Sequence, residues 1–118
     1  MGARDWDFAH CLPYFKRAEL IAALGTSDEF RGRNGPIAVC RGEMTNPLYE
    51  AFLTATGEAG HARSDDLNGY RQEGFGALEM SVDAGVRCST ARAYLSPVED
   101  RPNLSVVTSA TTYAVDVD

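Results

Sequence analysis

Apolar side chains recur every three or four residues near the start of the chain, from residue 7 to residue 24. This spacing predicts a helix with one apolar face. Asp7 is suited to cap its first turn, and Gly25 to end it. Because Pro13 lies inside the stretch, we expect a kink there or a division into two shorter helical pieces.

A second helix is predicted from Asn46-Pro47 to Gly60. Asparagine caps orphan amides, and proline at the first helical position loses no hydrogen bond. One face of this helix carries Leu48, Phe52, Ala55 and Ala59. We expect this face to pack against the core, which is commoner for such a stripe than lining a ligand site with Tyr49 or Phe52.

The middle of the chain alternates between short strands and loops. The apolar run over residues 36–40 predicts a brief strand, whereas residues 63–76, rich in Asp, Asn and Gly, predict a structured loop. Residues 77–82 alternate between apolar and polar side chains, as in a half-buried strand. The sequence Asp83-Ala84-Gly85 is expected to turn this strand back towards Val86.

Ser89 is expected to cap a short helix that ends at Leu95, and Pro97 and Pro102 then bracket a connector. From Leu104 the chain becomes rich in β-branched residues, which predicts a strand, and residues 111–117 are expected to continue it. The predicted fold class is therefore α/β, or more narrowly a mixed α+β fragment without repeats.

Length and charge narrow the possible functions. The chain has 118 residues, enough for one modest core, and a formal net charge of −6 without a dense basic stretch. Nucleic acid is therefore not an expected partner. No apolar run approaches the roughly 20 residues that a membrane-spanning helix requires. The average apolar content predicts a soluble chain.

The three cysteines, Cys11, Cys40 and Cys88, are odd in number and widely separated, which fits neither a disulfide framework nor the paired spacing of a zinc site. We expect small, buried or half-buried thiols in a reducing compartment, which favours a cytoplasmic location. A metal site built from Cys11 and His10 lacks a second pair of ligands, so no metal site is predicted.

The familiar catalytic signatures do not occur: there is no glycine-rich phosphate loop, nucleophile elbow or metal-binding histidine pair. His10 and His61 have no triad partner nearby in the sequence, and neither is assigned as a catalytic base. Asp65 and Asp66 are adjacent carboxylates that suit a side-chain-stabilised turn better than a calcium loop. The glycines around Phe75 allow close approach of the backbone, either to a cofactor or in a tight bend.

Ten strings, taken in order, are diagnostic together. They are Asp5-Trp6-Asp7, Cys11-Leu12-Pro13-Tyr14-Phe15-Lys16-Arg17-Ala18-Glu19, Phe30-Arg31-Gly32, Gly35-Pro36, Asn46-Pro47-Leu48, Asp65-Asp66-Leu67-Asn68-Gly69, Gln72-Glu73-Gly74-Phe75-Gly76, Arg87, Ser89-Thr90-Ala91-Arg92-Ala93-Tyr94-Leu95 and Arg101-Pro102-Asn103-Leu104. With these strings the chain resembles the glucose-methanol-choline (GMC) oxidoreductases, in particular their choline dehydrogenase-like branch. The resemblance runs from about Asp5 to about Val115.

This resemblance implies a larger two-domain enzyme, with a Rossmann-type FAD domain interleaved with a substrate domain. Residues 1–118 would be an internal part of both, without a complete independent domain. The family's glycine-rich pyrophosphate turn and catalytic histidine have no match here, so no catalytic residue is assigned. The one cofactor contact that carries over is the backbone near Thr112, against the adenine of FAD, in a string that departs from the family's aliphatic pattern.

The resemblance also implies the reaction: hydride transfer from an alcohol, with choline as the first candidate, to FAD in the full-length enzyme. The chain alone is expected to be inactive. The alternative from another class is a small, acidic, non-catalytic binding or interaction domain. Oligomeric state and the natural electron acceptor do not follow from the sequence.

Overall fold

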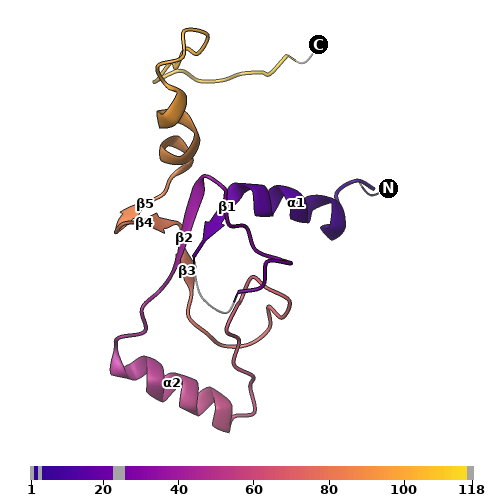
Figure 1. The fold of residues 1–118 in the computed structure, drawn as a ribbon, viewed down its shortest axis with the longest axis vertical. Coiled ribbons are helices and arrows are strands. Elements are labelled where there is room, and N and C mark those ends of the chain that lie inside the picture. Colours follow the sequence, from indigo (N-terminus) through magenta and orange to yellow (C-terminus); the bar gives the residue numbers. More distant parts are fainter. Residues whose placement is uncertain (1, 3, 23–25, 117–118) are drawn as a thin grey trace.

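The computed structural model describes residues 2, 4–22 and 26–116. Two α-helices, five short strands and two helical turns follow one another along this part of the chain. Figure 1 shows helix α2 at one end of the molecule and the C-terminal segment at the other, with the strands and α1 between them. The mixture of helices and strands confirms the predicted fold class.

Helix α1 spans Phe8–Ala18 and is undivided at Pro13. As predicted, Asp7 caps it, since its carboxylate accepts a hydrogen bond from the His10 amide at 2.9 Å. The helix ends earlier than the periodicity predicted, because strand β1 (Glu19–Ile21) begins directly after Ala18. The predicted last helical residue, Leu24, and the predicted stop at Gly25 lie outside the described residues.

Strand pairing explains the early end of α1. Strand β1 lies parallel to β2 (Ile37–Arg41), with Glu19 opposite Ile37 and Ile21 opposite Val39. The intervening chain packs so closely that a Cβ atom on Gly32 or Gly35 would overlap the backbone at the end of α1. Long-range pairing has therefore overridden the local helical spacing.

The predicted strand over residues 36–40 is confirmed by β2, which also pairs antiparallel with β3 (Glu79–Met80). Beyond β3 a two-residue hairpin joins β4 (Val82–Asp83) and β5 (Val86–Arg87). Its turn residues Ala84 and Gly85 have φ of 47° and 76°, which suits the right-handed twist of a hairpin. The turn is where the sequence predicted it, but the predicted strand over 77–82 is divided at Ser81.

Helix α2 spans Pro47–Glu58, and the Asn46 side chain accepts a hydrogen bond from the Leu48 amide at 2.9 Å, as predicted. The expected packing of its apolar face is not seen within the described chain: Leu48 is 74% exposed and Phe52 is 51% exposed. A T-shaped ring contact with Phe75, at 5.5 Å between centroids, is the aromatic contact that Phe52 makes.

After β5 the chain forms a short π-helical turn, Ala91–Leu95, and a 3₁₀ turn, Ser96–Val98. Ser89 accepts a hydrogen bond from the Arg92 amide at 3.2 Å, which confirms its predicted capping role. The predicted strand from Leu104 onward is wrong for this chain, since residues 104–116 form no strand. No described strand lies beside them, and a strand needs a partner. Val117 lies outside the described residues.

The chain buries little of its apolar surface. Within the described residues, the buried apolar side chains are Ile21 and Cys88. The accessible surface is 9848 Å², whereas a folded monomer of this mass exposes about 6,300 Å². The radius of gyration is 18.9 Å, against about 13–14 Å for a compact chain of this length. These residues therefore do not close a hydrophobic core of their own.

Candidate functional site

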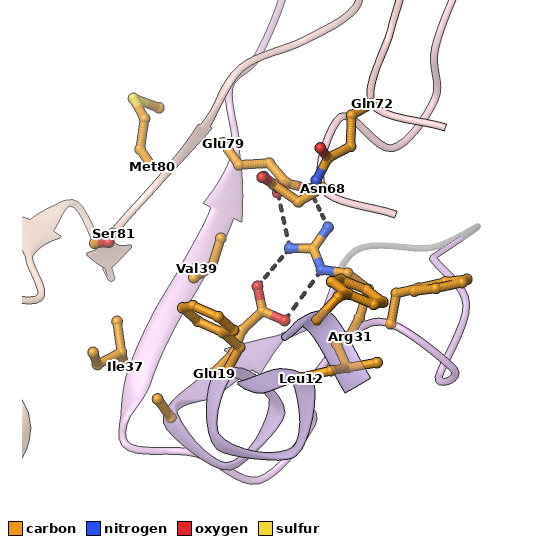
Figure 2. Close-up of a pocket in the computed structure, with 14 residues that line it drawn as sticks. Leu12, Glu19, Arg31, Ile37, Val39, Asn68, Gln72, Glu79, Met80 and Ser81 are labelled. Carbon is orange, nitrogen blue, oxygen red and sulfur yellow. Dashed lines mark hydrogen bonds and ion pairs between the residues drawn. The ribbon is translucent and has the colours of Figure 1, made fainter. Parts of the chain in front are cut away.

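The largest fully buried side chain in the described structure is a charged one, Arg31, at 2% exposure. Its guanidinium lies between two carboxylates, Glu19 from β1 and Glu79 from β3 (Figure 2). Nε and Nη2 donate to the two oxygens of Glu19, and Nη1 and Nη2 donate to the two oxygens of Glu79. Nη1 also donates to Asp66. All three partners are separated from Arg31 by at least twelve positions in the sequence.

Further hydrogen bonds hold the two glutamates in place. The Gly32 backbone N–H donates to Glu19 at 2.8 Å, and the Asn68 side chain donates to Glu79 at 2.8 Å. Arg41 adds a longer ion pair to Glu79 at 3.7 Å. We call these six side chains, Glu19, Arg31, Arg41, Asp66, Asn68 and Glu79, the Arg31 cluster.

The charges in the Arg31 cluster stabilise one another. Burial by itself raises the pKa of Glu79, but hydrogen bonds from Arg31 and Asn68 outweigh it, so the pKa lies below its usual value. Burial likewise lowers the pKa of Arg31, and the bonds to Glu19 and Glu79 reverse this and raise it. Both groups are therefore charged at neutral pH. Among the described residues, the buried atoms without a hydrogen-bond partner are Asp66 Oδ2 and Arg41 Nη2.

A hollow of about 580 Å³ adjoins the cluster. Its apolar lining comes from α1, the segment between β1 and β2, and the sheet. The lining residues are Phe8, Leu12, Phe15, Ala18, Phe30, Ile37, Val39 and Met80. Glu19, Arg31, Glu79, Asn68 and Gln72 supply polar lining, and Figure 2 shows Asn68 and Gln72 on the side of the guanidinium that faces Glu79.

The loop over residues 63–76 supplies Asp66 and Asn68. The Asp66 side chain accepts a hydrogen bond from the Asn68 backbone N–H at 3.1 Å, and the Asp66 backbone carbonyl accepts one from the Gly69 N–H at 3.2 Å. The predicted side-chain-stabilised turn is therefore confirmed for Asp66. Asp65 points elsewhere: its side chain is 88% exposed and lies 3.9 Å from Arg63.

The glycines around Phe75 form a tight bend, one of the two interpretations left open by the sequence. Phe75 exchanges backbone hydrogen bonds with Ala62 and Ser64, at 3.0 and 2.9 Å. Gly74 has φ of +139°, a conformation that favours glycine. The close backbone approach is thus made to residues 62–64 of the same chain.

Neither histidine belongs to the Arg31 cluster. His10 is more than half exposed and contacts Asp7, whose pKa is lowered by hydrogen bonds from the His10 amide and side chain. The His61 ring contacts the Phe75 ring in a tilted arrangement, with 5.4 Å between the ring centroids.

The cysteines are free thiols: Cys11 and Cys40 are partly exposed and Cys88 is buried, which confirms the expectation of half-buried thiols. Within the described residues, no group of three or more His, Cys, Asp or Glu side chains could hold a metal ion. No helix in the same residues is long and apolar enough to cross a membrane.

Thr112, the residue expected near a cofactor, is exposed. It belongs to the C-terminal segment, which Figure 1 shows extending away from the strands. Residues 105–116 make no backbone hydrogen bond to any described residue. Their N–H and C=O groups are therefore available to pair with another surface.

Sequence reasoning did not single out the Arg31 cluster. Glu19, Arg31, Asp66 and Asn68 occur in the strings that resemble the family. No spacing links them to one another or to Glu79, because the fold alone brings these residues together. Chemically, the cluster is an ion-pair network whose charged groups are engaged with one another.

Known proteins resemble this chain in sequence and in fold. A family model described as GMC oxidoreductase matches residues 1–116. The chain is 52% identical over 109 residues to an oxygen-dependent choline dehydrogenase from Staphylococcus haemolyticus and 50% identical to one from Staphylococcus aureus. Each match covers 92% of this chain and 19% of the relative.

Among solved structures, pyridoxine 4-oxidase from Mesorbium loti superposes with a TM-score of 0.74 at 28% identity, over 86% of this chain and 20% of that protein. The chain thus spans about one fifth of the length of the proteins that it matches. On the family match, the sequence identity and the shared fold together, the chain belongs to the GMC oxidoreductases.

Proposed function

We propose that this chain is part of an FAD-dependent oxidoreductase that acts on the CH–OH group of an alcohol, with choline as the first substrate to test. The observation that carries this proposal is the 52% identity to an oxygen-dependent choline dehydrogenase over 92% of the chain. Fold alone would not support an activity. Because the match covers 92% of the chain, it includes the Arg31 cluster in the middle of the chain.

We also propose that residues 1–118 contribute to both an FAD domain and a substrate domain and complete neither. The exposed apolar face of α2 and the 9848 Å² of accessible surface support this. Burial of apolar side chains is the main favourable term in folding. A stable enzyme would therefore cover these surfaces with further polypeptide. The same observations count against the alternative of a self-contained acidic binding domain.

In the proposed contact with FAD, this chain contributes backbone groups near Thr112. The free N–H and C=O groups around Thr112 suit the edge of an adenine ring, which presents both donors and acceptors. When bound, FAD supplies the chemistry, since a flavin accepts a hydride from the alcohol carbon. The family resemblance assigns no residue of this chain to the pyrophosphate or to the hydroxyl proton.

The role proposed for this chain is therefore to present the Thr112 backbone and to support the hollow through the Arg31 cluster. The small-molecule alcohol and FAD are the proposed partners. The free thiols of Cys11, Cys40 and Cys88 support a reducing, cytoplasmic location.

The complete reading frame that contains these residues provides the test. We expect the purified product to carry flavin and its flavin absorbance to be bleached by choline without oxygen. Retained flavin that no primary alcohol reduces would contradict the proposed reaction. A product that neither retains nor binds FAD would contradict the proposed cofactor.

A further inference from the structure

The loop over residues 63–76, taken together with Ala62, is called here the loop over residues 62–76. Its two ends, which form its neck, are joined by backbone hydrogen bonds. Phe75 pairs with Ala62 and Ser64, and the Ser64 hydroxyl donates to the Arg71 carbonyl at 3.1 Å. A Cβ atom on Gly74 would lie 2.8 Å from the Ala62 carbonyl oxygen, so the neck is tight. Compact loops with adjacent ends hold their shape through such internal contacts. Beside the neck, Arg63 pairs with Asp65 at 3.9 Å, and both side chains are more than half exposed.

The tip of the same loop is held by charge. Asp66 pairs with Arg31, and the Asn68 side chain donates to Glu79. The Asp66 side chain is 13% exposed and that of Arg31 is 1% exposed, so water screens this pair weakly. The tip therefore contacts the sheet through polar groups that converge on one guanidinium.

We propose that Arg31 docks the tip of the loop over residues 62–76 onto the β1–β2–β3 sheet, and that docking is separable from closure of the loop at its neck. The inference stands on the ion-pair geometry and does not depend on the proposed reaction. Its consequence is local. Asn68 and Gln72, which line the hollow, are held in place by a residue from another segment.

The geometry requires arginine. The guanidinium makes five hydrogen bonds to three carboxylates, and these carboxylates come from β1, the loop and β3. A lysine ammonium has three donors at a single point and cannot span the three partners. Arg31→Lys therefore keeps the charge and loses the docking.

Asp66→Asn and Asp65→Asn form a matched pair for the test. In Asp66→Asn the side-chain carbonyl would still accept from the Asn68 backbone N–H, so the turn is kept while the negative charge that faces Arg31 is removed. Asp65 is adjacent and exposed, which makes Asp65→Asn the control. Hydrogen exchange is measured by NMR in the longer protein that contains these residues, at the Arg31 guanidinium, at the Ser64 and Phe75 amides of the neck, and at the Cys88 amide as a distant reference.

In Asp66→Asn we expect the guanidinium protons to exchange on the order of 10-fold faster or more. The neck and Cys88 amides should stay within about 2-fold of their original rates. Asp65→Asn should change none of them.

Equal acceleration at the neck, or equal effects of the two variants, would overturn the proposal. An unprotected Arg31 guanidinium in the unsubstituted protein would do the same. If Asp66→Asn loses protection everywhere, Asn68→Ala, which removes only the bond to Glu79, takes its place in the same comparison.

Discussion

The Arg31 cluster and the C-terminal segment over residues 104–116 are opposite cases in one chain. In the cluster, residues up to forty-eight positions apart are joined by hydrogen bonds and ion pairs, as between Arg31 and Glu79. In the segment, β-branched residues suited to a strand make no backbone pairing with the described residues, and Val107 is 77% exposed. The polar contacts of this chain are largely made internally, whereas much of its apolar surface and strand pairing requires a partner.

Helix α2 belongs with the second case. Its ends are defined locally, by the Asn46 cap and by Gly60 at φ of +83°. Its apolar face is nevertheless exposed. Local signals are thus sufficient to form the helix, and they do not provide the surface that would cover it.

The largest expected effect comes from breaking the cluster. Arg31→Met leaves Glu19, Asp66 and Glu79 without their shared partner, and we expect the free energy of unfolding to fall by about 3–5 kcal/mol. Urea titration followed by circular dichroism measures this. The control, Arg101→Met, alters an exposed side chain and should change the free energy by less than about 0.5 kcal/mol. Similar losses in the two variants would show that the cluster is not the stabilising unit.

This contrast also explains what the sequence could and could not predict. The caps at Asp7 and Asn46, the hairpin turn at Ala84-Gly85 and the turn at Asp66 were predictable, because each depends on residues within a few positions. The end of α1 at Ala18 was not, since pairing of β1 with β2 decides it. The strand predicted from Leu104 has the right composition and no described partner.

The candidate site was less predictable than the fold. The Arg31 cluster depends on contacts between β1, β3 and two loops, which no periodicity reveals. Thr112 came from a family resemblance, and its contact with FAD stays a prediction.

A second expected effect concerns pH. The pKa of Glu79 is lower in the folded chain than its ordinary value of 4.5, so its ion pairs stabilise the fold above that value. This contribution is lost as the pH falls through the folded pKa. We expect Glu79→Gln to reduce the acid dependence of unfolding below about pH 5, measured by urea titration across pH. An unchanged acid dependence would show that Glu79 is not a major contributor.

A smaller effect is expected at Thr112, where the backbone carries the proposed contact. In the longer protein, Thr112→Pro removes one N–H and should weaken FAD binding about 5-fold, as expected for one hydrogen bond. Thr112→Ala keeps the N–H and should bind FAD normally. Flavin fluorescence during titration measures both. Equal affinities would place the adenine contact elsewhere.

The smallest effect is expected at Leu48, which is 74% exposed. In the 118-residue chain, Leu48→Ser should change the free energy of unfolding by less than about 0.5 kcal/mol. In the longer protein, where we propose that the face is covered, the same change should cost about 2 kcal/mol. Urea titration of both proteins makes the comparison. A small effect in both would show that the face of α2 stays open.

The central claim is that these residues are a supporting part of a flavoenzyme and have no activity alone. The most direct measurement mixes the purified 118-residue chain with FAD, choline and an electron-accepting dye. We predict that the chain retains no yellow flavin after desalting and that the dye is not reduced. Stable flavin binding together with choline-dependent dye reduction by this chain would contradict the claim.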